Sequence, residues 1–199
     1  MNNKFTIRLV TADDPGQILE VYKPYVLNTA NTFEYDVPTA EEIRKRIEKI
    51  SAQYPYLVCE HDGQIIGYTY GSTHRERTAY QWSAEVTVYV KEDFHRHGVA
   101  RALYNALFAM LKMQGYHSMY AGVLSTNIKS VGFHRAMGFE DIGIFKNIGY
   151  KLGEWHSNLW MQGFLKAHDT EPAVPVAIGV IDEQFVEAVL MEANERVTN

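Results

Sequence analysis

The chain has a single cysteine, Cys59, among its 199 residues. One cysteine can form neither a disulfide within the chain nor a cysteine metal cluster, so we expect Cys59 in the core and no metal cofactor. No apolar run reaches transmembrane length, and the N-terminus lacks the pattern of a signal peptide. These absences predict a cytoplasmic protein with no membrane partner.

Positive charge is also in short supply. The chain carries 19 Lys and Arg against 24 Asp and Glu, a formal net charge of −5. An acidic balance argues against nucleic acid as a general partner. The content of 46% hydrophobic and 22% charged residues is ordinary for a soluble globular protein, and the length suits one domain.

Residues 86–111, VTVYVKEDFHRHGVARALYNALFAML, form a locally basic stretch against this acidic background. The β-branched start, residues 86–90, predicts a strand. Apolar residues then recur at three- and four-residue spacing from Gly98 onward, which predicts a helix that ends at Gly115.

The loop between this strand and helix predicts an anion site. The first N–H groups of a helix have no intrahelical partner and lie at the positive end of its dipole, so they can hold a phosphate. Gly98 permits close approach of the backbone, and Arg96 adds a fork of donors. An ordinary strand-turn-helix with a solvated basic loop is the alternative.

Residues 95–100, HRHGVA, resemble the Q/R-x-x-G-x-G/A signature of the GNAT acyl-CoA-dependent N-acetyltransferases. His95 stands where that family usually has Gln or Arg. The resemblance implies acetyl-CoA as co-substrate, with its pyrophosphate held by this loop. The residues implied in binding it are Arg96, His97, Gly98, Val99, Ala100 and Arg101.

The order of elements along the chain agrees with that family. Caps, turns and periodicity predict strands at residues 5–10, 56–60, 64–71, 82–90, 117–123, 139–145 and 155–164. Helices are expected after Asp13 or Asp14, after a capping box of Thr39 and Glu42, from Gly98, and at residues 127–137. Asp62-Gly63 predicts a hairpin turn. This order is that of the GNAT fold, an α/β fold with a mixed, mostly antiparallel central sheet and helices on both faces.

Further fragments resemble the branch of the family that contains phosphinothricin and methionine sulfoximine acetyltransferases. They are Asn31-Thr32-Phe33-Glu34, Gly67-Tyr68, residues 75–80, residues 84–90, Asn127, Ser130, His134 with Gly138-Phe139, and residues 149–155. His74 departs from this branch, standing where Phe or Trp is usual, and Ser157 stands where Asp is common. Both positions are expected to line or support the acceptor pocket.

Two residues are candidates for proton transfer. Glu85 is a charged residue within an apolar strand, and we interpret it as the base that deprotonates the acceptor amine. A glutamate on the solvent face is the alternative. The branch has a histidine at the position of His134, which implies an acid for the leaving thiolate. Packing of His134 on its helix is the other interpretation.

Backbone and side-chain groups around Glu85 complete the predicted site. The resemblance implies that Val88, Tyr89 and Val90 present backbone to the oxyanion and the pantetheine arm, while Asn127 caps a helix or binds that arm. Arg75 and Arg77 suit an acceptor carboxylate, with a solvated loop as alternative. The implied acceptor residues are Phe33, Arg75, Glu76, Arg77, Glu85, Val86 and Thr87.

The tail is not covered by the resemblance, so we divide the chain into a GNAT domain at residues 1–167 and an extension at residues 168–199. Residues 185–197 have an amphipathic period, which predicts a helix on the domain or on a partner subunit. A homodimer is expected from the resemblance and from the aromatic stretch 150–160.

The function implied is acetylation of the α-amine of a small amino-acid analogue. Two alternatives stay open. One is a non-catalytic domain that binds acyl-CoA as a sensor, and the other is an enzyme that acts on peptide N-termini or polyamines. The sequence does not reveal the physiological acceptor.

Overall fold

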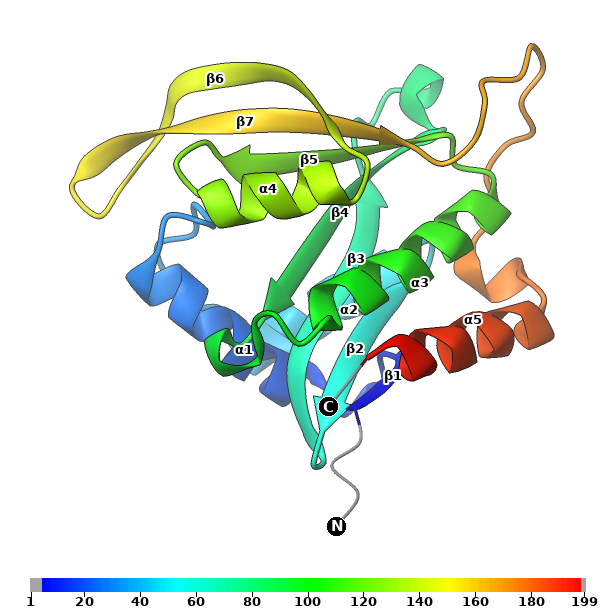
Figure 1. Ribbon diagram of the computed structural model, residues 1–199, viewed down its shortest axis with the longest axis horizontal. Coiled ribbons are helices and arrows are strands. Elements are labelled where there is room, and N and C mark those ends of the chain that lie inside the picture. The colour runs from blue at the N-terminus through cyan, green and yellow to red at the C-terminus, as the bar shows by residue number, and fades with distance from the viewer. Residues whose placement is uncertain (1–4, 198–199) are drawn as a thin grey trace.

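The computed structural model describes residues 5–197, which build one seven-stranded sheet in the order β1-β2-β3-β4-β5-β7-β6 (Figure 1). The strands are β1 Phe5–Leu9, β2 Tyr56–His61, β3 Gln64–Thr73, β4 Ser83–Val90, β5 Ser118–Leu124, β6 Glu140–Lys151 and β7 Glu154–Phe164. β4 and β5 pair in parallel, and the other neighbours pair antiparallel. The expected mixed, mostly antiparallel α/β sheet is confirmed.

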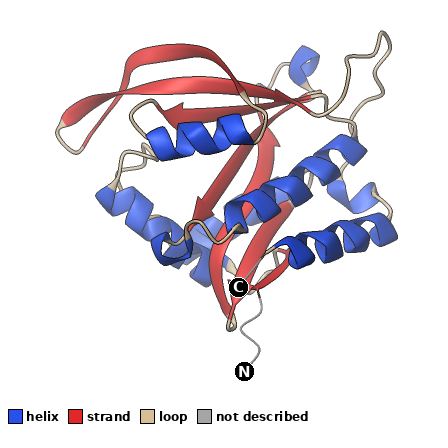
Figure 2. Ribbon diagram, viewed as in Figure 1, coloured by secondary structure: helices blue, strands red, loops and turns tan. Residues whose placement is uncertain are grey.

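Helices cover both faces of the sheet (Figure 2). α1 Pro15–Asn28 and α2 Ala40–Ser51 pack on one face, where their apolar residues form a core with β2 and β3. α3 Val99–Gln114, α4 Ile128–Ala136 and α5 Glu183–Arg196 contribute to a larger core on the other face. No helix within residues 5–197 is long and apolar enough to cross a membrane.

Local sequence signals determine several of these boundaries. The Thr39 hydroxyl accepts from the Glu42 N–H and the Glu42 carboxylate accepts from the Thr39 N–H, which confirms the capping box of α2. Asp62 and Gly63 have φ of +50° and +75°, as a two-residue turn between β2 and β3 requires. Gly115 ends α3 with a φ of +104°.

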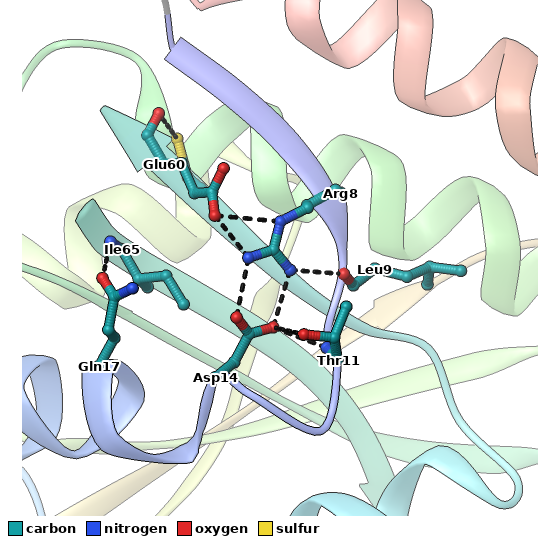
Figure 3. Close-up of polar contacts among 8 residues, drawn as sticks. Arg8, Leu9, Thr11, Asp14, Gln17, Glu60 and Ile65 are labelled. Carbon is teal, nitrogen blue, oxygen red and sulfur yellow. Dashed lines mark hydrogen bonds and ion pairs between the residues drawn. The ribbon is translucent and has the colours of Figure 1, made fainter. Parts of the chain in front are cut away.

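Asp14 occupies the N-cap position of α1 but does not cap it with its side chain. Its carboxylate instead accepts from Arg8 at 2.7 and 2.8 Å and from the Thr11 N–H at 2.6 Å (Figure 3). Arg8 also donates to Glu60 on β2. The group therefore ties β1, β2 and the start of α1 together.

β6 is longer than expected, because it continues beyond Phe145 to Lys151. It is an outer strand of the sheet, and nearly all of its residues are exposed. A strand without a buried face needs no alternating pattern of apolar and polar residues, so its second half carried no period-two signal. Leu152 and Gly153, with φ of +52° and +87°, form the turn to β7.

The amphipathic helix of the tail, α5, lies on the domain itself. It packs against α3 and β1, and Val186, Val189 and Ala193 join the core of that face. The Asn194 amide accepts from the Ile7 N–H at 2.5 Å and donates to the Ile7 carbonyl at 3.1 Å. Asn194 thereby satisfies outward-facing backbone groups of β1, the other outer strand of the sheet.

Candidate active site

β4 and β5 start side by side and then separate (Figure 1). Their parallel pairing ends at Glu85 and Tyr120, although β4 continues to Val90 and β5 to Leu124. The Lys91 N–H donates to the Ile66 carbonyl of β3, so it points toward β3. N–H groups of successive residues in a strand point alternately to one side and to the other. The N–H groups of Val88 and Val90 therefore point away from β3, toward the opening beside β5.

The predicted anion loop lies beyond the end of β4. Arg96 and Gly98 have φ of +70° and +79°, and Gly98 is the N-cap of α3 without a side-chain cap. The first helical bond runs from the Ala102 N–H to the Gly98 carbonyl, so the N–H groups before it, at residues 99–101, have no intrahelical acceptor. The side chains of Arg96, His97 and Arg101 are exposed around this end. This arrangement fits a phosphate group.

His95 turns its ring back to the strand. Its Nε2 lies 2.9 Å from the Val90 carbonyl oxygen, and the Tyr25 hydroxyl donates to the same oxygen at 2.5 Å. His95 and Tyr25 therefore fix the end of β4 to the loop and to α1. The contact of Tyr25 has no local signal in the sequence, because Tyr25, Val90 and His95 belong to three separate segments.

Glu85 lies at the point where β4 and β5 part, in a row of paired residues that runs Ser72, Glu85, Tyr120 and Gln162 across the sheet. One carboxylate oxygen, Oε1, lies 3.0 Å from Nδ1 of His74. Burial raises the pKa of Glu85, and the His74 contact and the positive charge of Arg75 act against that increase. Glu85 is thus a partly buried carboxyl group with one hydrogen-bond partner and a pKa raised by burial.

The other residues of β4 divide between the two faces. Thr87 and Tyr89 share the face of Glu85, where the Tyr89 ring packs edge-on against Tyr22 and Tyr25 of α1. Val86 is 5% exposed and belongs to the opposite core. Of the predicted acceptor residues on β4, the side chains of Glu85 and Thr87 therefore face one way and that of Val86 faces the other.

His134 is 5% exposed and has partners for both ring nitrogens. Nδ1 lies 2.8 Å from the Ser130 carbonyl oxygen, so Nδ1 carries the proton, and Nε2 at 3.1 Å accepts from the Tyr104 hydroxyl. Burial lowers the pKa of His134, which keeps the ring neutral. These contacts favour the packing interpretation over an acid role.

Asn127 is the expected N-cap of α4, where its Oδ1 accepts from the Ser130 N–H at 3.1 Å. Its Nδ2 donates to Oδ1 of Asn31 at 2.9 Å. Asn31 belongs to the segment between α1 and α2. Asn127 therefore links α4 to the segment that holds Phe33.

Phe33 packs against the backbone of β6, since a Cβ on Gly149 would lie 2.5 Å from its ring. The Nζ of Lys151 donates to the Thr32 carbonyl at 2.8 Å. Lys151 is 3% exposed, and burial lowers its pKa. The burial of Lys151 was not predicted, because a lysine in a strand that is otherwise exposed gives no sign of burial.

Arg75, Glu76 and Arg77 are exposed in the connection after β3. Within the part of the chain that the structure describes, their side chains form no hydrogen bond or ion pair. The charge of Arg75 acts on Glu85, which places Arg75 in the neighbourhood of the carboxylate. Among residues 5–197 no cluster of His, Cys, Asp and Glu could hold a metal ion.

Free N–H groups on β4, an uncapped basic end of α3 and the carboxyl group of Glu85 are the kinds of group that acyl transfer uses. Residues 7–160 match the model of the acetyltransferase (GNAT) domain, and the chain belongs to the GNAT acetyltransferase family. The family and the enzyme class expected from the sequence are thereby confirmed.

Named relatives and a solved structure are similar over most of the chain. Phosphinothricin N-acetyltransferase of Alcaligenes faecalis is 37% identical over 83% of this chain and 85% of its own. L-methionine sulfoximine/L-methionine sulfone acetyltransferase of Pseudomonas aeruginosa is 33% identical over 76% and 88%. A Sinorhizobium meliloti phosphinothricin acetyltransferase, solved with acetyl-CoA, has a TM-score of 0.82 and 34% identity over 87% and 95% of the two chains.

Proposed function

We propose that this protein transfers an acetyl group from acetyl-CoA to the α-amine of a small amino-acid analogue. The observation that carries the proposal is the place of Glu85, where β4 and β5 part and the free backbone of β4 begins. Relatives of this similarity are named for phosphinothricin and for methionine sulfoximine or sulfone.

The co-substrate would contribute an activated acetyl thioester. We assign its pyrophosphate to the start of α3, where the backbone of residues 98–101 and the side chains of Arg96, His97 and Arg101 surround free N–H groups. The N–H groups of Val88 and Val90, with Tyr89 between them, are available to an acyl carbonyl oxygen and to the pantetheine amides. This co-substrate is consistent with a cytoplasmic location.

Glu85 acts on the acceptor. In its ionised form the carboxylate takes a proton from the acceptor ammonium group, which leaves the amine lone pair free to attack the thioester carbonyl carbon. As the C–N bond forms, the C–S bond breaks and coenzyme A leaves as its thiolate, while the second proton of the nitrogen passes to that thiolate or to solvent water. A raised pKa makes Glu85 a stronger base than an exposed glutamate. A free α-amine has a pKa of about 8, so only modest help is needed at neutral pH.

The acceptor carboxylate is assigned to Arg75 and Arg77. Both guanidinium groups are exposed and lie in the connection after β3, between His74 and the 3-10 turn Thr78–Tyr80. A planar fork of donors suits a carboxylate. Phe33, Glu76, Val86 and Thr87 complete the proposed acceptor surroundings.

We assign Asn127 to positioning of the Asn31–Phe33 segment and, through the same amide, to contact with the coenzyme arm. For His134, the contacts of the ring favour packing over a role as the acid that protonates the leaving thiolate. Delivery of a proton to the leaving thiolate from Nε2 requires loss of the Tyr104 contact and a change of tautomer. We therefore assign His134 to packing of α4 against α3.

The carboxylate assignment is tested with pairs of acceptors in a thiol-release assay. Methionine sulfoximine, methionine sulfone and phosphinothricin are each compared with the corresponding decarboxylated amine, in the wild type and in Arg75→Ala and Arg77→Ala. Loss of a charge-assisted hydrogen bond costs about 1.5–3 kcal/mol, or roughly one to two decades in kcat/KM. In both variants we expect KM for the amino acid to rise by this factor. KM for the decarboxylated amine should change little, and the affinity for acetyl-CoA should be unchanged.

Arg44→Ala is the matched control, because it removes a half-exposed arginine from α2. Equal wild-type rates on an amino acid and its decarboxylated amine would contradict the carboxylate assignment. A preference for peptide N-termini or polyamines would favour those acceptors instead. Acyl-CoA binding without thiol release on any amine would indicate the sensor function.

A further inference from the structure

His74 lies beside Glu85, at a position where the related acetyltransferases usually have Phe or Trp. A Phe side chain could only pack there, because it has no ring nitrogen to donate a hydrogen bond as His74 does. Its ring stacks on Tyr120 with centroids 4.2 Å apart and planes at 10°. Trp160 and Tyr80 meet it edge-on at 5.7 and 6.2 Å. The side chain is 11% exposed. Three aromatic contacts from β5, β7 and the 3-10 turn therefore fix the ring plane.

The ring has one hydrogen-bond partner in the described structure, Oε1 of Glu85 at 3.0 Å from Nδ1. An ionised carboxylate can only accept a hydrogen bond. Whenever Glu85 is ionised, Nδ1 must therefore carry the proton. The contact involves one carboxylate oxygen and leaves Oε2 without a partner in the described residues.

We propose that His74 is a positioning residue for Glu85: it holds Oε1 from a fixed ring and directs Oε2 to the acceptor amine. The inference rests on the proposed function, because it gives a role to a residue that acts through the base.

The groups around His74 and Glu85 allow the effect of the His74 hydrogen bond to be separated from that of other neighbours. Tyr70 of β3, Tyr80 of the 3-10 turn and Tyr120 of β5 face the pair, and the Tyr120 hydroxyl accepts from Gln162 of β7. Arg75 is the nearby cation that acts on Glu85. His74 alone among them donates directly to the carboxylate.

Loss of the His74 donor should change the pKa of Glu85 in one direction only. Burial raises the pKa of Glu85 and the His74 hydrogen bond lowers it, so removal of the bond raises the pKa further. The base is active when ionised. The acid limb of kcat/KM must then move to higher pH, which a role in packing alone does not predict.

His74→Phe is the central variant, because Phe retains a ring for the Tyr120 stack and loses the donor. We expect the acid limb of kcat/KM to shift up by about one pH unit, so that at a fixed pH on that limb the rate falls roughly tenfold and recovers at higher pH. Acetyl-CoA affinity should not change. His74→Asn keeps an N–H donor at the position of Nδ1 and should restore much of the wild-type profile.

A second measurement does not depend on turnover. The carboxyl carbon of Glu85 is followed by ¹³C NMR as the free protein is titrated with acid. The midpoint should be higher in His74→Phe than in the wild type, and intermediate or unchanged in His74→Asn. Circular dichroism establishes that each variant is folded.

Glu85→Gln separates failure of the inference from failure of the proposed function. A wild-type rate and pH profile in Glu85→Gln would mean that Glu85 is not the base, which overturns both. A roughly 10²-fold loss in Glu85→Gln, together with an unshifted acid limb and midpoint in His74→Phe, would overturn the role of His74 alone.

Discussion

The carboxylates of Asp14 and Glu85 differ in the number of hydrogen bonds they accept and in the direction of their pKa shifts. Asp14 is 3% exposed and has donors on both oxygens, from Arg8 and Thr11. Burial opposes its ionisation, but the hydrogen bonds outweigh burial and lower the pKa. Glu85 has one donor, and burial raises its pKa. The Asp14 carboxylate, with both oxygens hydrogen-bonded, contributes to stability. The Glu85 carboxylate has one oxygen without a partner in the described residues, and that oxygen can take a proton.

Asp14→Asn should destabilise the fold in a pH-dependent way. The folded-state pKa of Asp14 is depressed, so its contribution is fully present above the unfolded value of about 3.9 and is lost as pH falls through the folded value. We expect a deficit of about 1–3 kcal/mol at pH 7 that shrinks below about pH 4. Urea unfolding at several pH values measures it.

The exposed neighbour offers a control for this prediction. Asp13→Asn changes the same charge at an exposed position next to Asp14 and should have little effect. A deficit in Asp14→Asn that is the same at pH 7 and pH 3 would mean that shape, and not charge, explains the loss.

At the scale of elements, the N-terminus of α3 has a backbone that only some residues tolerate. Gly98 has a φ of +79°, which disfavours a side chain regardless of space. Space itself is available, because the nearest atom to a Cβ there is the Arg196 carbonyl oxygen at 3.8 Å. Substitution at Gly98 therefore combines backbone strain with whatever the new side chain does to a bound anion.

Gly98→Glu and Gly98→Gln separate these two effects, because they share size and strain and differ in charge. We expect both to bind acetyl-CoA more weakly than the wild type, and the Glu variant to bind about tenfold more weakly than the Gln variant. The difference should narrow in high salt, where charges are screened. Calorimetric titration measures both affinities. Wild-type affinity in folded Gly98→Glu would refute the assignment of the pyrophosphate to this helix.

At the scale of the whole molecule, the outer strand β6 exposes a row of apolar side chains. Five of its apolar or aromatic residues are about half exposed: Ile142, Ile144, Phe145, Ile148 and Tyr150. An open edge strand with apolar side chains is an aggregation risk unless something covers it. The opposite edge, β1, is closed by Asn194 of α5. We infer that a second copy of the chain covers β6.

Sedimentation should therefore give a dimer at micromolar concentration. Ile144→Lys combined with Ile148→Lys places charge on the exposed strand and should shift the protein to a monomer with its circular dichroism retained. Met191→Lys, on the exposed side of α5, is the matched control and should leave the dimer intact. A monomeric wild type would contradict the inference.

The sequence by itself determined the elements whose signals are local. The capping box of Thr39 and Glu42, the Asp62-Gly63 turn, the glycines that bound α3 and the Asn127 cap each depend on residues within a few positions. The basic loop before α3 is local in the same way. These signals were sufficient for the order of elements and for the family.

Only the tertiary structure decided which side chains meet. His74 reaches Glu85 across a strand pair, Lys151 reaches Thr32, and Asn194 reaches Ile7 from the other end of the chain. The end of β6 and the buried partners of His134 were likewise not predictable from local patterns. Such contacts depend on strand register and helix packing, which place distant residues together without leaving a periodic pattern in the sequence around either one.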